Sequence, residues 1–434
     1  MSFANAALFV GLENVHLYEQ AAQFTEVGAG VNISRNANRI LDAYGLKDAM
    51  MWKSSRNPPC YMEYRHYQTG EYLGQIEEFG EPASRQIHRA HLLDALQERV
   101  PASVLHTGKR LRSIHFTGSH YVLDFDDDTV ATADIIIGCD GIKSVVRKHL
   151  GITDQPIYSG QVVYRGYVQY EDLSPDAAAI FRKTVAFRGP QKHILTLPIG
   201  NDESKTARIG VIGFMTESLD AWKSESWMAT SPIDRLHDHV QDWASPIQEL
   251  IDGLRKSAPD GQMLKQTLYV REPVDKWYHI EPSNPRCGIV LVGDSVHSTL
   301  PHQGIISPEP TPLCHRFTPN RRTGQGTCMA IESGIALATI LRNWASDHLE
   351  SAFELYQAIR KPRTDRVTQT SYEAGKLASA DRPDSFTSDF NPDALRERMK
   401  WIMEEDVLAE VYRRGGPFFT TETKSGPAQL QANL

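Results

Sequence analysis

The sequence predicts an α/β fold in which an antiparallel sheet interrupts a parallel one, with helices at the C-terminal end. Two short apolar runs, residues 134–139 (DIIIGC) and 288–292 (GIVLV), are each followed by a glycine and an aspartate. Such runs are typical of parallel strands that are buried on both faces. Segments of alternating polarity lie between the two runs, within residues 160–271, and alternation predicts antiparallel strands. Helical patterns prevail after residue 326.

Composition limits the classes of function. With 434 residues, 41% of them hydrophobic, the chain can bury a large core. The net charge of -8 gives no electrostatic reason to expect nucleic acid or an anionic membrane as partner. No apolar stretch reaches the roughly 18 residues of a membrane span. The five cysteines form no CxxC pair and their number is odd, which suits a reducing compartment, so we expect a cytoplasmic protein. The histidines lack metal-ligand spacing, and no metal is expected.

The N-terminal elements alternate between strand and helix. Asn14–Glu19 (NVHLYE) has the pattern of a strand and ends in an acid, at the place where a dinucleotide-binding fold holds the carboxylate for the adenosine ribose. A helix follows within Val27–Leu41, and Ser34 or Asn36 is expected to cap its first turn. A further helix is expected at His91–Val100.

Each of the two apolar strands ends where a ligand can bind. The first runs into Asp140-Gly141 and a helix-like segment, Val145–Leu150, whose start offers amide donors to a phosphate. The second delivers Asp294, whose carboxylate can accept hydrogen bonds from a polyol of the flavin-ribityl type. Taken alone, either aspartate could equally be a helix cap or a loop residue. Together the two strands suggest a ligand site at the carboxyl ends of parallel strands.

Turn residues and alternation place the antiparallel strands. Hairpins are expected around Gln68–Gly70 and Gly118–His120. Strands at residues 161–170, 193–200 and 207–215 predict a separate sheet that forms a substrate-side layer.

The C-terminal third is predicted to be helical. Thr327–Arg342 and Ser351–Val367 predict two helices, and Asn391–Val411 predicts one closing helix. The tail from Arg413 is rich in Gly, Thr, Ser and Gln and is predicted to be disordered.

The two aspartate-bearing strands, with the Pro-His-Gln-Gly turn at residues 301–304, resemble the flavoprotein aromatic hydroxylases, the single-component FAD monooxygenases of the salicylate hydroxylase type. The resemblance implies a Rossmann-like FAD-binding domain with an inserted antiparallel-sheet substrate domain and C-terminal helices. It implies FAD as cofactor, NADH or NADPH as a diffusible electron donor, and hydroxylation of a salicylate-like or phenolic small molecule with O2. The implied domains are residues 1–159 (first FAD part), 160–271 (substrate domain), 272–380 (second FAD part) and 381–434 (closing helix and tail).

The resemblance also implies the residues that contact FAD. Gly28 and Gly30 would let the backbone approach the cofactor, and Arg89 matches an arginine placed against its phosphate and ribityl region. The family has an acid two residues after that arginine, where this chain has His91, and Arg89 could alternatively be a solvated residue at a helix end. The implied cofactor residues are Glu19, Gly30, Val31, Arg89, Asp140, Asp294, Gly304, Gly326 and Thr327.

Three residues are implied in catalysis or substrate binding. Arg165 matches a position from which an arginine can hold an acidic substrate by a forked contact, or it is an ordinary cation on a sheet face. His302 matches a histidine near the reaction centre, or it only bonds a backbone carbonyl. His193 is a further pocket residue, and Leu197 stands where the family often has tyrosine, so substrate recognition is expected to differ.

The chain departs from the family pattern at two places. The family opens with a strand, a Gly-x-Gly-x-x-Gly loop and a helix, whereas this sequence starts at about the end of that helix. Residues 305–324, rich in proline, separate Gly304 from Gln325, and their deletion restores PHQGQGTCMAIES. A retained intron is one interpretation of this insert, and a genuine surface loop is the other. With both departures the chain is expected to bind FAD poorly, because the phosphate donors are missing and the turn at Gln325-Gly326 is displaced.

Three alternatives stay open at this point. One is another flavin-dependent epoxidase or reductase of the same superfamily. The second is an inactive or mis-assembled flavoprotein, which the two departures favour. A nicotinamide dehydrogenase ranks last, because no strand-Gly-x-Gly-x-x-Gly-helix unit is present.

Overall fold

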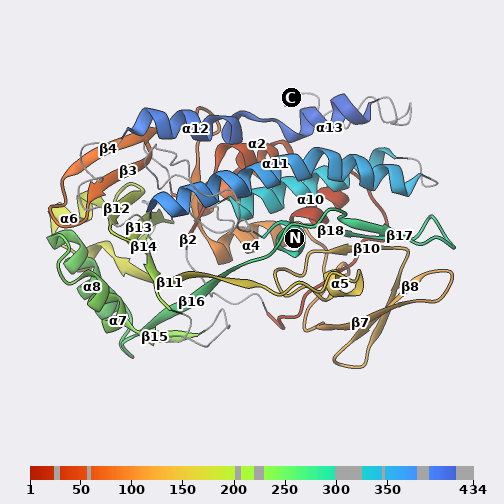
Figure 1. Ribbon diagram of the computed structural model, residues 1–434, viewed down its shortest axis with the longest axis horizontal. Coiled ribbons are helices and arrows are strands. Elements are labelled where there is room, and N and C mark those ends of the chain that lie inside the picture. Colours follow the sequence, from red (N-terminus) through yellow and green to blue (C-terminus); the bar gives the residue numbers. More distant parts are fainter. Residues whose placement is uncertain are drawn as a thin grey trace.

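The computed structural model describes residues 1–23, 30–55, 60–200, 207–218, 229–298, 325–344, 348–378 and 391–416. Figure 1 shows a large sheet with two covering helices on one side of the molecule and a smaller α/β layer on the other, with long helices lying across both. The sheets and helices confirm the α/β class that the sequence predicts.

Parallel strands form the core of the smaller layer. β10 (Ile135–Gly138) pairs in parallel with β18 (Gly288–Leu291), and β17 (Tyr278–Ile280) adds an antiparallel strand to the other side of β18. β1 (Leu17–Tyr18) pairs in parallel with β6 (Leu105–His106). The two strands that precede the aspartates are therefore neighbours. The strand predicted over NVHLYE is shorter in the structure, because only its last apolar pair finds a partner strand.

Two of the helices over this layer pack closely against each other. α1 (Ser2–Phe9) packs against α10 (Gly326–Asn343). Gly334 makes this contact possible, because a Cβ added there would lie 2.9 Å from the backbone nitrogen of Phe3. α11 (Leu349–Ala378) lies beside α10 along the length of the molecule (Figure 1).

The large sheet has eight strands and confirms the predicted antiparallel layer. Its strand order is β15-β16-β11-β14-β13-β12-β3-β4. The strands are β3 (Cys60–His66), β4 (Tyr72–Glu77), β11 (Ile157–Gln169), β12 (Val185–Gly189), β13 (Lys192–Ile199), β14 (Arg208–Thr216), β15 (Thr230–Pro232) and β16 (Gln262–Val270). β3 and β4 form the hairpin predicted at residues 68–70, and β3 joins β12 in parallel. The sheet therefore recruits two strands from the segment before residue 160.

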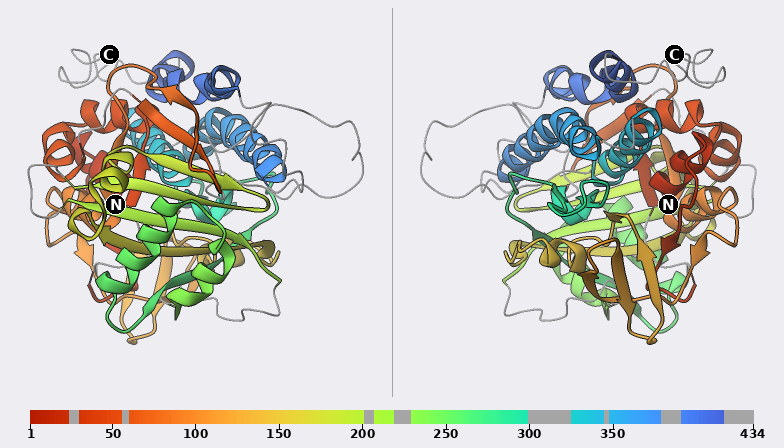
Figure 2. Two further views of the ribbon diagram at one scale, coloured as in Figure 1. Left: turned by 90° about the vertical axis from the view of Figure 1, so that its left-hand side faces the viewer. Right: turned by 90° about the vertical axis from the view of Figure 1, so that its right-hand side faces the viewer.

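The two faces of the large sheet have different neighbours. One face packs against α6 (Pro175–Ile180), α7 (Ile233–Val240) and α8 (Ser245–Ser257) through a cluster of buried side chains that includes Val162 and Tyr164. The left view of Figure 2 shows α7 and α8 in front of this sheet. Because side chains alternate along a strand, Val163, Arg165 and Tyr167 lie on the opposite face. We call this opposite face, which carries the cluster of Val163, Leu197, Ile199, Ile212, Phe214, Leu268 and Val270, the inner face.

Short elements connect the two layers. β2 (Gly30–Ile33) pairs in antiparallel fashion with β5 (Arg85–His88), and α4 (Arg89–Gln97) follows β5 directly. The remaining elements are α2 (Arg35–Ala43), α3 (Lys47–Lys53), β7 (Leu111–Phe116), β8 (Tyr121–Phe125), β9 (Val130–Ala133), α5 (Val145–His149), a 3-10 turn at Tyr170–Asp172 and α9 (Asp294–His297). β7 and β8 form the second predicted hairpin.

The prediction of one closing helix is wrong. Two helices, α12 (Pro392–Glu404) and α13 (Val407–Gly415), replace it. Asp406 separates them, because its Oδ1 accepts hydrogen bonds from the backbone N–H groups of Leu408 and Ala409, each at 3.0 Å, and so caps a new helix. Residues 413–415 are helical rather than disordered, and the rest of the predicted tail lies outside the described residues.

Candidate active site

Asp294 lies at the carboxyl end of β18, in a turn that hydrogen bonds to the neighbouring strand fix in place. Gly293 adopts φ 71°, a conformation that favours glycine, and it lets the chain leave β18 and enter α9 at once. The Ser295 hydroxyl donates to the carbonyl of Gly138 at 2.6 Å, which ties the turn to β10. A Cβ on Gly293 would lie 3.4 Å from Cβ of Ala330, so the turn also abuts the first turns of α10.

The described surroundings of Asp294 offer its half-buried carboxylate no hydrogen-bond donor. Burial raises the pKa of Asp294 to about 6, because the charged form has lost its water. No residue of the described segments donates a hydrogen bond to this carboxylate. Ligand hydroxyls at this point would supply the missing donors, so the site fits the ribityl chain that the sequence assigned to Asp294.

The start of α10 adjoins this turn. Gly326 and Thr327 form its first turn, where backbone N–H groups of an 18-residue helix have no partner within the helix. Gln325, which precedes them, donates through Nε2 to the Ser34 hydroxyl at 3.1 Å. Gln325 is the described part of the turn that the insert was expected to displace, and its hydrogen bond to Ser34 fixes it. Gly304 lies outside the described residues.

The prediction that Ser34 or Asn36 caps α2 through its side chain is wrong. Ser34 occupies the capping position but makes no side-chain cap bond, because its hydroxyl serves Gln325. Asn36 lies inside the helix and donates to Glu332 of α10 at 2.6 Å. Both side chains therefore connect α2 to α10.

Glu332 is the centre of a buried charge cluster that holds α10. Its carboxylate pairs with Arg360 and Arg363 of α11, each at 2.8 Å. Although burial alone would raise the pKa of Glu332, the two arginines outweigh it and lower the pKa to about 2. Because Asn36 also donates to this carboxylate, α2, α10 and α11 meet at one ionised group.

Asp140 caps the start of the helix that follows it. Its Oδ2 accepts from the N–H groups of Val145 (2.7 Å) and Val146 (3.1 Å) at the start of α5. Of the two roles open to a strand-end aspartate, the structure supplies the helix cap. A contact of Asp140 with the cofactor stays a prediction.

Glu19 follows β1 at an exposed edge. Its Oε1 accepts from the N–H of Ala21 at 2.9 Å. Burial lowers the pKa of the Met1 amino group, and the charges of Cys139 and Glu19 both act against that shift. The position fits the acid expected at the adenosine ribose.

On the other side of the site, β2 and β5 bring two predicted residues to the large sheet. Gly30 packs directly on it, since a Cβ at this position would lie 2.4 Å from Cδ1 of Ile199. The room that Gly30 leaves is thus taken by the large sheet, and a cofactor contact at this glycine stays a prediction. Val31 pairs with Ile87, and Gly28 lies outside the described residues.

Arg89 and Arg165 are positive residues from different layers whose charges act on each other. Arg89 is the exposed first residue of α4, and Arg165 lies on the inner face of β11. Burial, and then the positive charge of Arg89, lower the pKa of Arg165 to about 10. An anionic group between the two guanidinium groups would relieve this repulsion. The cap of α4 comes from His88, which accepts the N–H of Ala90 at 3.1 Å.

His193 lies on the inner face of β13, stacked on Phe214 with ring centroids 4.4 Å apart. Burial, and then the charge of Arg188, lower the pKa of His193 to about 3. The imidazole is therefore neutral at physiological pH and suits ring stacking or hydrogen bonding better than acid catalysis. His302 lies outside the described residues.

Sequence reasoning missed Arg188. It is 3% exposed, lies directly opposite His193 in the register of β12 and β13, and burial lowers its pKa to about 10. The signal for it was a single arginine at the end of the apolar run VAFRG, in a strand that the sequence did not predict.

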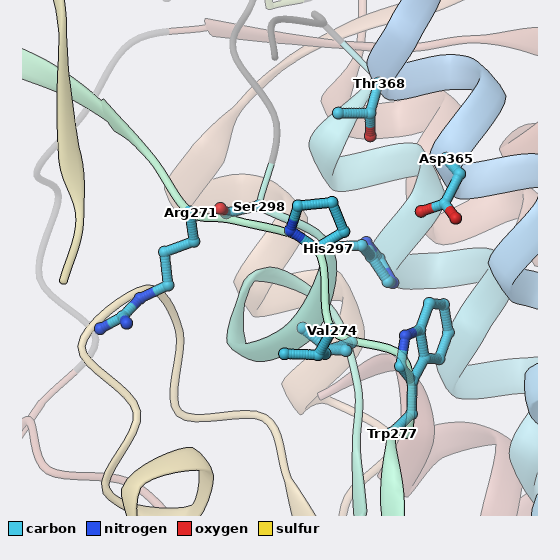
Figure 3. A pocket seen from close by; sticks show the side chains of 9 residues that line it. Arg271, Val274, Trp277, His297, Ser298, Asp365 and Thr368 are labelled. Atoms are coloured by element: carbon cyan, nitrogen blue, oxygen red, sulfur yellow. The ribbon is translucent and has the colours of Figure 1, made fainter. Parts of the chain in front are cut away.

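His297, in α9 with Asp294, was also missed. Figure 3 shows it beside Trp277 in a cavity of about 10 Å³, which is about the space that one water needs. Its Nε2 lies 3.0 Å from the Ser333 hydroxyl, and burial lowers its pKa to about 3. Within the described residues, Nδ1 of His297 and the Ser298 hydroxyl have no hydrogen-bond partner. A water in this cavity would satisfy both.

Neither a metal site nor a membrane span occurs among the described residues. They contain no group of three or more His, Cys, Asp or Glu side chains placed to hold a metal ion. Among their helices, none is both long and apolar enough to cross a membrane.

The chain is similar over most of its length to curated monooxygenases. It is 29% identical to a 6-hydroxynicotinate 3-monooxygenase of Pseudomonas fluorescens over 377 residues, which cover 85% of this chain and 87% of the relative. It is 29% identical to a salicylate hydroxylase of Pseudomonas putida over 427 residues, 93% of this chain and 90% of the relative. No family model matches the chain.

Solved structures show the same fold. A salicylate hydroxylase substrate complex superposes with a TM-score of 0.72 and 23% identity, and the match covers 94% of each chain. The similarity in sequence and in fold covers most of the chain. The chain is therefore a homologue of the FAD-dependent aromatic hydroxylases of the salicylate hydroxylase type.

Proposed function

We propose that this protein hydroxylates the ring of an acidic or phenolic aromatic small molecule, using FAD, O2 and NADH or NADPH. The enzyme is an FAD-dependent monooxygenase. The finer assignments, which concern the substrate group and the role of each residue, are proposals. Hydroxylation is favoured over the epoxidase and reductase alternatives, because the relatives named above carry out ring monooxygenation by name.

The observation that carries the proposal is the half-buried carboxylate of Asp294, which lies at the carboxyl end of a parallel strand and accepts no hydrogen bond from the described residues. Burial raises the pKa of this carboxyl group to about 6, and hydroxyl donors of a ligand would stabilise its ionised form. The carboxyl end of a parallel strand in an α/β sheet is the place where such ligands bind. The ribityl chain of FAD supplies hydroxyl groups of this kind.

Residues around Asp294 fit the rest of the cofactor. The first turn of α10, at Gly326 and Thr327, offers backbone donors beside the Asp294 turn, and Glu19 fits the adenosine ribose. Arg89 supplies a positive charge next to β2. Bound FAD supplies the redox chemistry and the activation of O2, and the protein supplies binding, orientation and electrostatics.

The inner face of the large sheet fits the substrate. Arg165 offers a forked contact to an acidic or phenolic group, and His193 with Phe214 offers a stacked surface near the predicted pocket. We assign His302 the role of a hydrogen-bonding or proton-transfer group near the reacting ring, on the resemblance alone. Arg188 provides a second buried cation on the same face.

A cytoplasmic location completes the proposal. Four cysteines of the described residues, Cys60, Cys139, Cys287 and Cys328, are thiols rather than members of disulfides. Thiols are stable in a reducing compartment, where NADH and NADPH are also available as diffusible donors.

The test combines flavin content with the origin of the product oxygen. The purified chain is examined for bound FAD by its absorption spectrum, and NAD(P)H consumption is followed with salicylate and with 6-hydroxynicotinate, the compounds named in its relatives. With FAD added in excess, the expected result is NAD(P)H oxidation that the substrate stimulates, weak in the full chain and stronger after deletion of residues 305–324, and a product that carries one oxygen atom from 18O2. FAD-loaded protein that only releases hydrogen peroxide with every acid tried would contradict ring hydroxylation.

A further inference from the structure

A contact between the two layers involves a tyrosine that the functional assignments above do not use. Tyr167 of β11 and His88 of β5 meet with 2.6 Å between the tyrosine oxygen and Nε2 of the imidazole. Tyr167 lies two residues after Arg165 on the same strand, and therefore on the same inner face. Gly210 stands opposite Tyr167 in the register of β14, so no side chain of that strand crowds it there.

The hydrogen bonds of His88 determine which atom carries its proton. Its Nδ1 accepts the N–H of Ala90 at 3.1 Å and so cannot carry a hydrogen in this geometry. A neutral imidazole that accepts at one nitrogen donates at the other. Nε2 of His88 is therefore the donor to the oxygen of Tyr167, and the hydroxyl proton of Tyr167 is directed away from His88.

The charges around Tyr167 favour an electron-rich group. The guanidinium of Arg208 lies 5.7 Å from the centre of its ring. Arg165 is close enough for the charges of both Arg89 and Tyr167 to act on it. A hydroxyl that donates, set among three arginines, is suited to hydrogen bond with an anionic oxygen.

We propose that Tyr167 is a substrate-recognition residue, whose hydroxyl donates a hydrogen bond to the anionic oxygen of the aromatic substrate beside Arg165. His88 acts as a positioning residue, because its donated hydrogen bond fixes the direction of that hydroxyl. The inference rests on the proposed function and narrows it to substrates with a carboxylate or phenolate oxygen at this point. The competing possibility is that the pair only ties β5 to β11.

The experiment compares three variants of the FAD-loaded full chain. Tyr167→Phe removes the hydroxyl. His88→Asn keeps a side-chain oxygen that can cap α4 but cannot reach Tyr167. Tyr158→Phe is the matched control, because this tyrosine lies on the same strand and its hydroxyl donates to the carbonyl of Glu217 at 2.9 Å. FAD content, thermal unfolding, KM, kcat and the dissociation constant are measured for salicylate and for its neutral analogue salicylamide.

Loss of a hydrogen bond to a charged group weakens binding by about 10- to 100-fold. Tyr167→Phe is expected to raise the dissociation constant and KM for salicylate by that factor, with a smaller change for salicylamide and unchanged FAD content. His88→Asn should shift salicylate in the same direction by a smaller factor, and Tyr158→Phe should shift neither ligand.

Three results separate the possible failures. Salicylate binding by Tyr167→Phe could be unchanged, or the affinities for salicylate and salicylamide could fall equally while thermal stability also falls. Either result would show that the His88–Tyr167 pair only holds β5 against β11. A wild-type protein that holds FAD but responds to no aromatic acid would overturn the anionic substrate class itself. A wild-type protein without FAD under any condition would instead count against the proposed function.

Discussion

At the residue scale, Asp294 links stability to cofactor binding. Its folded pKa of about 6 lies above the ordinary aspartate value of 3.8. The folded protein without FAD therefore holds a proton that the unfolded chain releases, and the stability of that form falls as pH rises from about 4 through 6. Asp294→Asn is expected to stabilise the FAD-free protein above pH 6 by up to the order of 3 kcal/mol, and to make no difference below pH 4. Urea unfolding at pH 4 and pH 8 measures both; equal stability of the two proteins at pH 8 would show that the carboxylate already has a partner.

The same substitution has the opposite effect on FAD. A ribityl hydroxyl that donates to the ionised carboxylate favours loss of the proton, so the affinity of the wild type for FAD should fall by up to about tenfold per pH unit below 6. Asp294→Asn should bind FAD about 10- to 100-fold more weakly at pH 7, with no such pH dependence. Quenching of FAD fluorescence on binding provides the dissociation constants. A wild-type affinity that does not vary between pH 5 and 7 argues against the contact.

Arg165 should act on substrate and leave the cofactor in place. Because it lies on the inner face of the large sheet, Arg165→Ala is expected to raise KM for an acidic substrate by about 10- to 100-fold, with FAD content retained. Arg112→Ala is the control, since its guanidinium is exposed and pairs with Asp128 at 2.9 Å in the β7–β9 sheet. Steady-state kinetics measure KM for the acidic substrate in both variants. An unchanged KM in Arg165→Ala would show that Arg165 does not bind the substrate and has only a structural role.

At the element scale, one side chain sets the packing between β2 and the large sheet. Ile199 fills space that two glycines leave open: a Cβ on Gly30 would lie 2.4 Å from its Cδ1, and one on Gly210 2.5 Å. Gly30→Ala is expected to cost about 1 to 3 kcal/mol through overpacking, and Ile199→Ala about 2 to 5 kcal/mol through a cavity. The double variant should cost less than the sum, because the smaller residue at 199 makes room for the new methyl group. Additive losses in urea unfolding would show that the two residues do not share this space.

Elements that depend on local pattern were predictable from the sequence, whereas those that depend on distant partners were not. The strands before Asp140 and Asp294 were predicted because a short apolar run that ends in a glycine and an aspartate is typical of a buried parallel strand. The addition of β3 and β4 to the large sheet could not be read from the chain, because β3 pairs with a strand more than a hundred residues away. The break at Asp406 was hidden because Ile402 and Leu408, on either side of it, are both buried and continue one apolar pattern.

The candidate site follows the same division. Asp294, Arg89 and Arg165 stand in recognisable local sequences, and in the structure the charge of Arg89 acts on Arg165. Arg188 and the His88–Tyr167 pair could not be recognised from the sequence alone, because each depends on a neighbour in another strand or in the other layer. Ser34 failed as a predicted cap because a partner on α10, distant in sequence, competes for its hydroxyl.

At the scale of the whole molecule, the insert at residues 305–324 can be tested by its removal. Deletion of Ile305–Gly324 joins Gly304 to Gln325, which Ser34 already holds. The deletion is expected to raise FAD retention and substrate-stimulated NAD(P)H oxidation, since displacements of about 1 Å near reacting groups already cost on the order of 100-fold in rate. A variant with the insert replaced by Gly/Ser residues of equal length is the control and should not recover. Lower FAD retention after deletion would identify the insert as a working part of the protein.

The two fixed points on either side of that segment have a consequence for how the protein can change over time. His297 is held by Ser333, and Gln325 by Ser34, so the chain between them begins and ends at anchored positions. Lengthening such a connection from residues 299–304 to residues 299–324 costs only about 1 kcal/mol of closure entropy. A cost of this size changes folding stability very little. Natural selection for stability alone would therefore not remove the added residues, whereas selection for catalysis would. Normal expression and a normal melting temperature would thus say little about whether this enzyme turns over.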